Sequence, residues 1–382
     1  MIRKISLGLL GLLGLILIGG GATYLLTMPE SLPQNSMSEA WLAAGPHDVG
    51  FADFVLIDES RETMANADAP RLANRTFPTS IWYPENIEAS HPLVIHSHGF
   101  VSERSDLAYV AELLASHGYV VAAADYPLTA GATPGGPNAD DLVNQPADIS
   151  FLIDSILQLA GDDKPFAGNI DASRIALMGY SLGGITTTLA TYHPRLRDER
   201  VKAAISIAGP SAGLTSKFYE TSDVPFLMIA GTLDALIDFE YNAAVITQRV
   251  RNSALMGIEG GTHLGFGSIS EPMLRLMDHP DGLGCTAVLS NLGSDPNAPF
   301  IPLGDESDGI VLDPSIPEVC ETMPSAKALH PGRQQMVTSI AVLSFFESVF
   351  SKDPERREAA RTQLSDILPA EMPEARFSSS SR

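Results

Sequence analysis

The pentapeptide Gly179-Tyr180-Ser181-Leu182-Gly183 constrains this chain more than any other feature. It follows the apolar run 175–178 directly and precedes a segment with helical character. A strand that reverses into a helix within two residues strains the central residue, and small neighbours keep the strand and the helix from colliding. The Ser181 hydroxyl is then exposed at a helix N-terminus, where N–H groups favour a developing anion. The pattern predicts an acyl-transfer nucleophile, with the Leu182 N–H as one oxyanion donor.

Buried strands and helices alternate on both sides of this turn. We predict strands at 92–96, 119–124, 201–207, 224–230 and 254–258, with helices at 107–117 and 148–159. Two earlier strands, 49–58 and 79–83, form an antiparallel edge, and 128–144 is a long loop. Strands that alternate with helices are typical of a mostly parallel sheet covered by helices on its faces.

An acid and a base follow two of these strands. Asp234 comes just after strand 224–230, and His263 lies on the loop after strand 254–258. Parallel sheets place their ligand sites at the carboxyl ends of the strands. We therefore predict that His263 takes the proton of Ser181 and that Asp234 orients His263. Asp238 is the rival acid, but its position suits a cap or a surface residue better.

The turn Ser97-His98-Gly99-Phe100 after strand 92–96 is the second oxyanion candidate. We expect the Phe100 N–H to donate to the oxyanion, while Gly99 allows the backbone to approach closely. His96 and His98 could instead suggest a metal site, but no acidic residue lies nearby in sequence. The aspartates of the later loop fit no EF-hand spacing, so we expect them to be solvated: Asp295, Asp305, Asp308 and Asp313. The predicted chemistry needs no metal and no cofactor.

Charge and the N-terminus restrict partners and location. A net charge of −22 argues against binding to nucleic acid or anionic membrane surfaces. Arg3 and Lys4 precede 22 uncharged residues, 5–26, about the length that crosses a bilayer. We expect 1–28 to be a signal peptide or an uncleaved membrane anchor, followed by a linker at 29–46. The remainder should lie outside the cytoplasm, in the periplasm or beyond. No pattern indicates an oligomeric state.

The C-terminal third departs from a compact domain. Cys285 and Cys320 are an even pair, which suggests one disulfide in an exported protein, with two unrelated buried thiols as the alternative. Both lie in a segment rich in Gly, Pro and Asp, 268–331, which we interpret as a lid-like insertion before a helix at 334–350. The catalytic domain spans 47–351. Residues 352–382 should form a charged helix, 354–368, and a disordered serine-rich tail.

With these residues identified, the chain resembles the α/β-hydrolase superfamily, and within it the dienelactone-hydrolase-like and platelet-activating-factor acetylhydrolase-like esterases. The motifs that carry the resemblance are 97–100, 115–126 (ASHGYVVAAADY), 145–148 (QPAD), 179–183, 231–234 and 261–263. The resemblance implies an α/β-hydrolase fold whose triad runs in the order Ser181, Asp234, His263. Dienelactone hydrolases proper use a cysteine nucleophile, so Ser181 argues against that activity. The 115–126 stretch and the turn at 97–100 are also similar to those of bacterial cutinases and polyester hydrolases.

These observations predict an exported serine carboxylic-ester hydrolase that cleaves small or medium acyl esters through an acyl-enzyme. Two alternatives stay within ester hydrolysis: a short-chain phospholipid acetylhydrolase and a polyester or cutinase-like hydrolase. The insertion favours small esters, because compact polyester-degrading relatives lack it and keep their site open. The non-enzyme alternative is a membrane-tethered binding protein that retains the fold.

Overall fold

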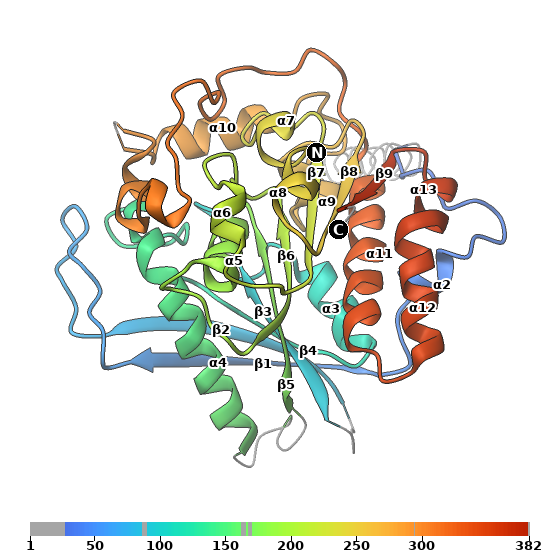
Figure 1. The fold of residues 1–382 in the computed structure, drawn as a ribbon, viewed down its shortest axis with the longest axis horizontal. Coiled ribbons are helices and arrows are strands. Elements are labelled where there is room, and N and C mark those ends of the chain that lie inside the picture. Colours follow the sequence, from blue (N-terminus) through green and yellow to red (C-terminus); the bar gives the residue numbers. More distant parts are fainter. Residues whose placement is uncertain (1–26, 86–89, 162–165, 167–169, 294, 381–382) are drawn as a thin grey trace, which may run out of the picture.

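The computed structural model describes residues 27–380 except 86–89, 162–165, 167–169 and 294 (Figure 1). The predicted signal peptide or anchor, apart from its last two residues, lies outside the described residues. Within the part of the chain that is described, no helix is both long enough and apolar enough to span a bilayer.

A nine-stranded sheet forms the centre of the molecule, in the order β1-β2-β4-β3-β5-β6-β7-β8-β9. The pairs β1–β2, β2–β4 and β8–β9 are antiparallel and all others are parallel. The mostly parallel α/β sheet and its antiparallel edge at 49–58 are therefore confirmed. The strands are β1 Val49–Asp58, β2 Arg75–Pro84, β3 His91–Ser97, β4 Val120–Ala124, β5 Ile170–Tyr180, β6 Val201–Ile207, β7 Phe226–Gly231, β8 Ser253–Ile258 and β9 Ala375–Ser379.

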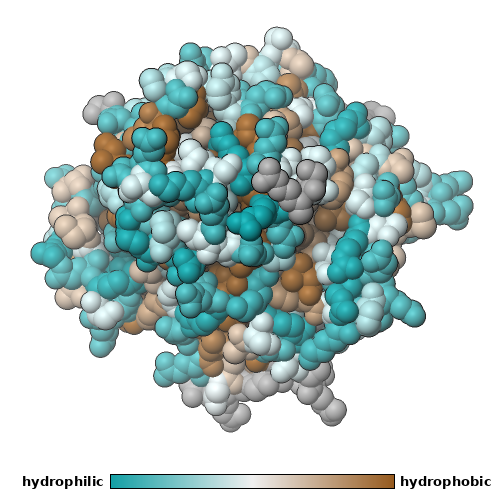
Figure 2. Space-filling model, viewed as in Figure 1, coloured by the Kyte–Doolittle hydropathy of each residue, from teal (hydrophilic) through white to brown (hydrophobic). Residues whose placement is uncertain are grey.

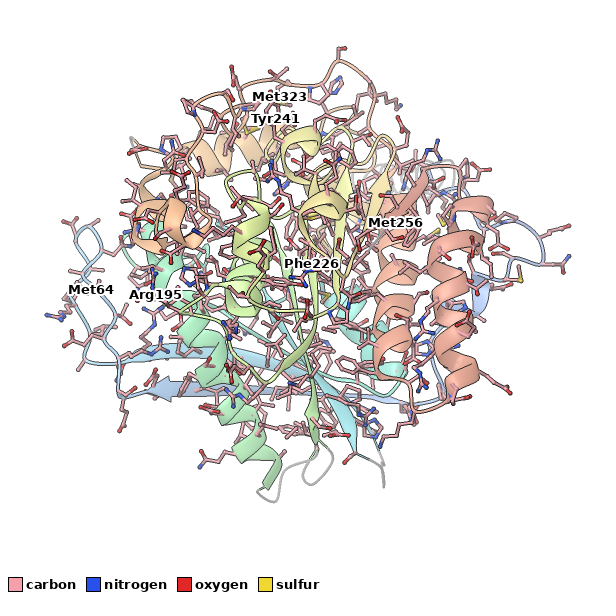
Figure 3. The ribbon with its side chains drawn as sticks, viewed as in Figure 1. Met64, Arg195, Phe226, Tyr241, Met256 and Met323 are labelled. Atoms are coloured by element: carbon pink, nitrogen blue, oxygen red, sulfur yellow. A yellow bond between two sulfur atoms is a disulfide. The ribbon has the colours of Figure 1, made fainter. Side chains whose placement is uncertain are left out.

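Helices cover both faces of this sheet. On one face α4 (Gln145–Gly161) and α5 (Leu182–Tyr192) pack on the strands, and on the other α3 (Ala108–Ser116) and α11 (Pro331–Phe350) do so. Phe226 on β7 and Met256 on β8, both labelled in Figure 3, belong to opposite faces. The shorter elements are α2 Glu39–Leu42, η1 Ala139–Asn144, α6 Ser216–Tyr219, α7 Phe239–Asn242, α8 Ile246–Arg249, η2 Leu264–Phe266, α9 Ser270–Leu274, α10 Asp281–Leu289, η3 Ala298–Leu303, η4 Glu306–Asp308, α12 Pro354–Thr362, η5 Gln363–Ile367 and α13 Leu368–Glu371.

The QPAD stretch is an anchor between elements. Arg75 at the start of β2 is 1% exposed, and its guanidinium contacts the carboxylates of Asp141 and Asp148 at 2.6 Å each. Gln145 donates to the Thr129 hydroxyl at 2.8 Å and accepts from Thr186 on α5. These contacts join β2, η1, α4 and α5, the helix that begins just after Ser181. Removing one partner of such a buried ion pair would leave the other charge unpaired, so the elements are held together strongly.

The serine-rich C-terminus corrects a prediction. Residues 375–379 were expected to be disordered but form β9, antiparallel to β8 from Ala254↔Ser379 to Ile258↔Ala375. Without β9, strand β8 would expose its unpaired N–H and C=O groups along a sheet edge. Ala375 is fully buried and Phe377 packs against the core on the α11 face. Composition alone predicts solvation here, whereas pairing at the edge stabilises a strand.

The segment predicted as a linker is also packed on the domain. Trp41 in α2 is 6% exposed, and the Arg356 guanidinium lies 3.8 Å from the centre of its ring. The Glu371 carboxylate accepts hydrogen bonds from the Ser36 hydroxyl and from the N–H groups of Met37 and Ser38, at 2.6–3.0 Å. Residues 36–42 therefore join the N-terminal approach to the C-terminal helices and do not form a free connector.

Candidate active site

Ser181 lies at the turn between β5 and α5, with φ 55° and ψ −118°. A positive φ is strained for a residue that carries a side chain. The flanking glycines make the turn possible. A Cβ on Gly179 would lie 1.9 Å from the Gly183 carbonyl oxygen, and a Cβ on Gly183 would lie 1.9 Å from the Ser97 carbonyl oxygen. The backbones of β5, α5 and the end of β3 therefore approach one another around Ser181 so closely that no side chain fits between them.

A chain of hydrogen bonds connects Ser181 to His263 and Asp234. His263 Nε2 lies 2.8 Å from Ser181 Oγ, and its Nδ1 lies 2.7 Å from Asp234 Oδ2. The other carboxylate oxygen, Asp234 Oδ1, accepts from the N–H groups of Leu236 and Ile237 at 2.9 and 2.7 Å. An ionised Asp234 requires Nδ1 to carry the imidazole proton, so Nε2 is free to accept from the Ser181 hydroxyl. The three predicted residues are thus brought together.

The rival acid lies elsewhere. Asp238 precedes α7, where its carboxylate accepts from the Tyr241 N–H at 3.0 Å as the N-cap of that helix. This is the cap position that the sequence suggested. The structure therefore places Asp234, and not Asp238, against His263.

The surroundings of His263 favour its protonated form. Burial alone would lower the pKa of His263, but the carboxylate of Asp234, with a further contribution from Asp281, raises it above its ordinary value. Tyr180, the residue before Ser181, donates its hydroxyl to the His263 carbonyl at 2.9 Å and packs its ring 5.1 Å from the imidazole. A base of raised pKa accepts the Ser181 proton more readily but becomes protonated, and so unavailable, at a higher pH.

The turn at 97–100 lies against Ser181. A Cβ on Gly99 would be 3.3 Å from the Ser181 Cβ. The Gly99 carbonyl accepts from His98 Nδ1 at 2.7 Å and from the Ser102 N–H at 3.2 Å. Because a trans peptide directs its N–H opposite to its carbonyl, these two bonds fix the direction of the Phe100 N–H. Within the described residues, neither the Phe100 N–H nor the Leu182 N–H donates to a backbone carbonyl. Neither group is thus held by a backbone acceptor in the described part of the chain.

Histidines of this turn have structural partners. His96 Nε2 lies 2.6 Å from Asp106 Oδ1, while Asp106 Oδ2 accepts from the Gly99 N–H at 3.0 Å. His98 Nε2 accepts from the Tyr126 N–H at 3.0 Å. Across the described residues, no group of three or more His, Cys, Asp or Glu side chains is placed to hold a metal ion. Asp308 pairs with Arg195, and Asp305 and Asp313 accept N–H groups of their own loops.

The sequence around this site matches a known family. Residues 71–276, more than half of the chain, match the family described as PET hydrolase-like. The chain belongs to the PET hydrolase-like family. The matched range contains Ser181, Asp234 and His263. It confirms the predicted superfamily of α/β-hydrolase serine esterases, although the sequence pointed first to dienelactone-hydrolase-like and acetylhydrolase-like members.

This PET hydrolase-like chain is similar in sequence to cutinases and similar in fold to a solved esterase. Cutinase est1 of Thermobifida alba is 28% identical over 188 residues, which cover 48% of this chain and 57% of that protein. Cutinase 1 of Thermobifida cellulosilytica is 27% identical over 235 residues, 60% of this chain and 76% of the relative. A solved ferulic acid esterase from Streptomyces cinnamoneus has a TM-score of 0.55 and 21% identity over 87% of this chain and 97% of its own. The last likeness shows the shared fold.

The insertion lies mostly beyond the PET hydrolase-like match. Its helix α10 carries Cys285, which is bonded to Cys320, so the predicted disulfide is confirmed. The Cys320 N–H donates to the Ala235 carbonyl at 3.0 Å, directly beside Asp234. Met323, labelled in Figure 3, lies 3.9 Å from the Cys285 sulfur. The insertion therefore touches the loop that carries the candidate acid.

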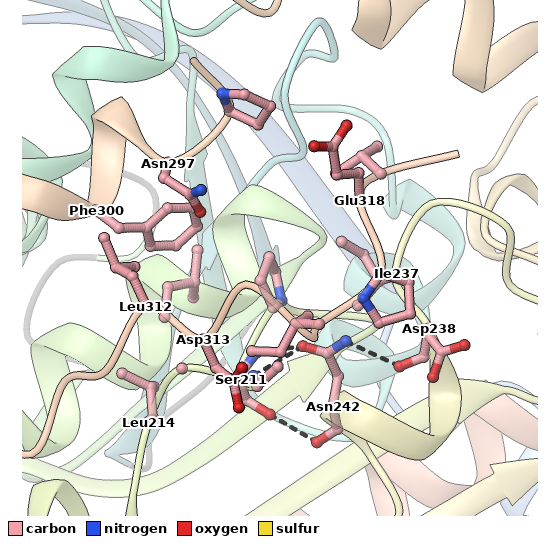
Figure 4. A pocket seen from close by; sticks show the side chains of 18 of the residues that line it. Ser211, Leu214, Ile237, Asp238, Asn242, Asn297, Phe300, Leu312, Asp313 and Glu318 are labelled. Carbon is pink, nitrogen blue, oxygen red and sulfur yellow. Dashed lines mark hydrogen bonds between the residues drawn. The ribbon is translucent and has the colours of Figure 1, made fainter. Parts of the chain in front are cut away.

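A cavity of about 280 Å³ lies between the domain and this insertion, and Figure 4 shows side chains that line it. The domain contributes Ile185, Leu214 and Leu236, and residues 296–319 of the insertion supply much of the remaining wall. Ile185, four residues after Ser181, and Leu236, two residues after Asp234, line this cavity, whereas the three site residues themselves do not. Asn242 holds the loop at 211, since it accepts from the Ser211 N–H at 2.7 Å and donates to the Asp238 carbonyl at 2.9 Å.

Two residues around this site escaped sequence analysis. Asp106 fixes the turn at 97–100, and Asp281 in α10 binds the loops of Asp234 and His263. Neither lies in a motif or at a spacing typical of a catalytic group. Asp106 lies seven residues after Gly99, but it is one of two acids in that stretch, and only the folded chain shows which backbone groups Asp106 and Asp281 bind.

Proposed function

We propose that this chain is a serine carboxylic-ester hydrolase with Ser181, His263 and Asp234 as its triad. The observation that carries the proposal is the continuous hydrogen-bonded chain from Ser181 Oγ through His263 to Asp234. Ser181 Oγ attacks the ester carbonyl carbon while His263 Nε2 takes its proton, and Asp234 stabilises the resulting imidazolium. The N–H groups of Phe100 and Leu182 bind the oxyanion.

The rest of the cycle needs only these groups and water. When the tetrahedral intermediate collapses, the C–O bond to the leaving alcohol breaks and His263 returns the proton to that alcohol. Water then attacks the acyl-enzyme with His263 as base, which releases the carboxylic acid and restores the Ser181 hydroxyl. No metal or cofactor enters the proposal.

Labelling by a fluorophosphonate tests the nucleophile directly. The probe phosphonylates a serine only where a base and an oxyanion site activate it. We expect one label per chain on Ser181, located by peptide mass spectrometry, and no label after heat denaturation. An unlabelled, folded protein would instead favour the binding-protein alternative.

Small or medium acyl esters are the substrates that the cavity supports best. Its volume of about 280 Å³ is just below the usual range of ligand sites, which begins at about 300 Å³, and its walls are mainly aliphatic. The carboxylates of Asp238, Asp313 and Glu318 also line it (Figure 4). Like charges would disfavour anionic substrates and would favour release of the acid product. This proposal keeps 268–331 as a lid-like part of the catalytic domain 47–351.

Polyester hydrolysis is the second candidate, and the PET hydrolase-like match favours it. Exposed apolar side chains of the insertion could adsorb to a polymer, and an apolar area lies at the upper left of Figure 2, the side of α10 in Figure 1. The exposed apolar side chains of the insertion are Ile269, Met273, Leu276, Met277, Leu283, Leu289, Ile301, Val311, Leu312 and Met323. Rates on p-nitrophenyl butyrate, on a short-chain phospholipid and on a polycaprolactone film distinguish the candidates. Hydrolysis of the film at a molar rate above that of butyrate would overturn our preference.

We further propose that the protein is exported.

We also propose that the Cys285–Cys320 bond holds the lid in the position that catalysis requires. The bond closes a separation of 35 residues, and in the chain-entropy treatment it stabilises the folded state by roughly 3–4 kcal/mol. A double variant, Cys285→Ser with Cys320→Ser, should lower both the thermal midpoint and kcat/KM. The Cys320 N–H donates to the Ala235 carbonyl, so motion of the unbonded segment would displace the neighbouring Asp234. A displacement of a catalytic group by about 1 Å costs on the order of a hundredfold in rate. A lower midpoint with unchanged kinetics at 25 °C would reduce the bond to a stabilising role.

A further inference from the structure

We propose that Asp281 is a positioning residue of this esterase. Its carboxylate, supplied by the insertion, joins the loop of Asp234 to the loop of His263 and places a second negative charge near the imidazole. The proposal rests on the proposed function above. The insertion would then position the catalytic base His263, in addition to forming a wall of the cavity.

Three backbone N–H groups converge on this carboxylate. Asp281 Oδ2 accepts from Ala235 at 3.0 Å and from His263 at 2.9 Å, and Oδ1 accepts from Leu264 at 2.8 Å. Asp281 is 2% exposed. One donor follows Asp234 directly, and the other two are His263 itself and its successor. A single side chain therefore fixes the backbone at both the acid and the base.

This contact complements a backbone link on the other side of the two loops. The Leu233 N–H donates to the Gly261 carbonyl at 2.8 Å, and a Cβ on Gly231 would lie 2.3 Å from that oxygen. That link precedes both Asp234 and His263 in the chain, whereas the Asp281 carboxylate binds at or just after them. The separation of the two loops is thus set on both sides of the acid–base pair.

Asp281 is not used as an ordinary helix cap. An acidic residue in the first turn of a helix commonly accepts N–H groups of that helix. Asp281 begins α10, yet its two oxygens accept from residues of the β7 and β8 loops. All three partners are donors, so the ionised carboxylate is the form that fits.

Electrostatics supports the same role. Burial lowers the pKa of His263, and Asp234 and Asp281 are the charged groups that oppose this and raise it. Burial and the nearby Asp234 raise the pKa of Asp281, against the lowering effects of His263 and of the N–H groups. Tyr180 faces the imidazole as a neutral phenol, since burial holds its pKa well above the ordinary value. Removing the charge of Asp281 should therefore make His263 easier to deprotonate.

The test is Asp281→Asn in the full chain, compared with wild type and with Asp278→Asn. Asp278 is an exposed acid of the same insertion that pairs with Lys327. NMR titration of the histidine Cε1–H signals, with His263 assigned by His263→Ala, follows the imidazole whether or not the protein turns over. We expect a lower His263 midpoint in Asp281→Asn and the wild-type midpoint in Asp278→Asn. An unchanged midpoint in Asp281→Asn would overturn the proposal.

Kinetics gives the second readout. An asparagine amide at position 281 would direct N–H groups at one of the three backbone donors, so the loops would shift. The concentration of active sites is first determined by fluorophosphonate labelling of a separate sample. On that basis we expect kcat for p-nitrophenyl butyrate to fall about ten- to a hundredfold, with KM little changed. The acid limb of kcat/KM should move to lower pH. If Asp281→Asn had the wild-type kcat per active site, the positioning role would be overturned. If His263 of the wild-type protein titrated as expected but the protein hydrolysed no ester, only the proposed function would be refuted.

Discussion

Replacing Ser181 by alanine should lower kcat/KM for p-nitrophenyl butyrate by about four to six powers of ten. Alanine leaves the turn, His263 and the two oxyanion N–H groups in place but removes the atom that forms the acyl-enzyme. The residual rate would come from water activated by His263 and from the oxyanion site. A stopped assay with the purified protein and an uncatalysed blank measures the loss.

The matched control is Ser290→Ala. Ser290 is an exposed residue just after α10 whose hydroxyl donates to the Thr286 carbonyl of that helix. This variant should retain the wild-type rate, since it removes a similar hydroxyl far from the chemistry. Equal activity of wild type and Ser181→Ala would refute the nucleophile and, with it, the proposed triad.

The positions of Ser181, Asp234 and His263 followed from local sequence because each lies at the end of a buried strand. Apolar runs identify such strands, and parallel pairing brings their carboxyl ends to the same edge of the sheet. The turn after β3 was predictable because it follows a buried strand; a Cβ on Gly183 would lie 1.9 Å from the Ser97 carbonyl oxygen, and one on Gly99 would lie 3.3 Å from the Ser181 Cβ. The parts of the site that lie in or beside the central strands could therefore be assigned without coordinates.

The parts that could not be assigned depend on contacts that no repeating sequence pattern marks. Asp281 reaches His263 across a loop that has no repeating pattern, and Asp106 reaches Gly99 through a turn. The serine-rich tail failed for a related reason. Its composition indicates solvation, but the open edge of β8 supplies a partner that composition does not show. The pairing of β9 with β8 and the binding of three N–H groups by the Asp281 carboxylate both depend on tertiary structure.

Asp234→Asn should reduce kcat by about four powers of ten, whereas Asp238→Asn should keep kcat within about tenfold of wild type. An asparagine at 234 can retain the N–H groups of Leu236 and Ile237 on its carbonyl oxygen, so its amide would donate toward His263 Nδ1. The imidazole would then carry its proton on Nε2 and could no longer accept the Ser181 proton, which is the basis of the expected loss.

The two variants are matched because both remove one acidic charge from the same loop. Asparagine is as good an N-cap as aspartate, so α7 should persist in Asp238→Asn, and an effect on KM is expected from its place in the cavity wall. Steady-state kinetics at pH 8, with circular dichroism to confirm folding, compares them. A large loss of kcat in Asp238→Asn with little loss in Asp234→Asn would transfer the acid to Asp238. Similar small losses in both would mean that His263 does not need Asp234 for its orientation, because the contacts of its loop, including those with the Asp281 carboxylate, would then suffice.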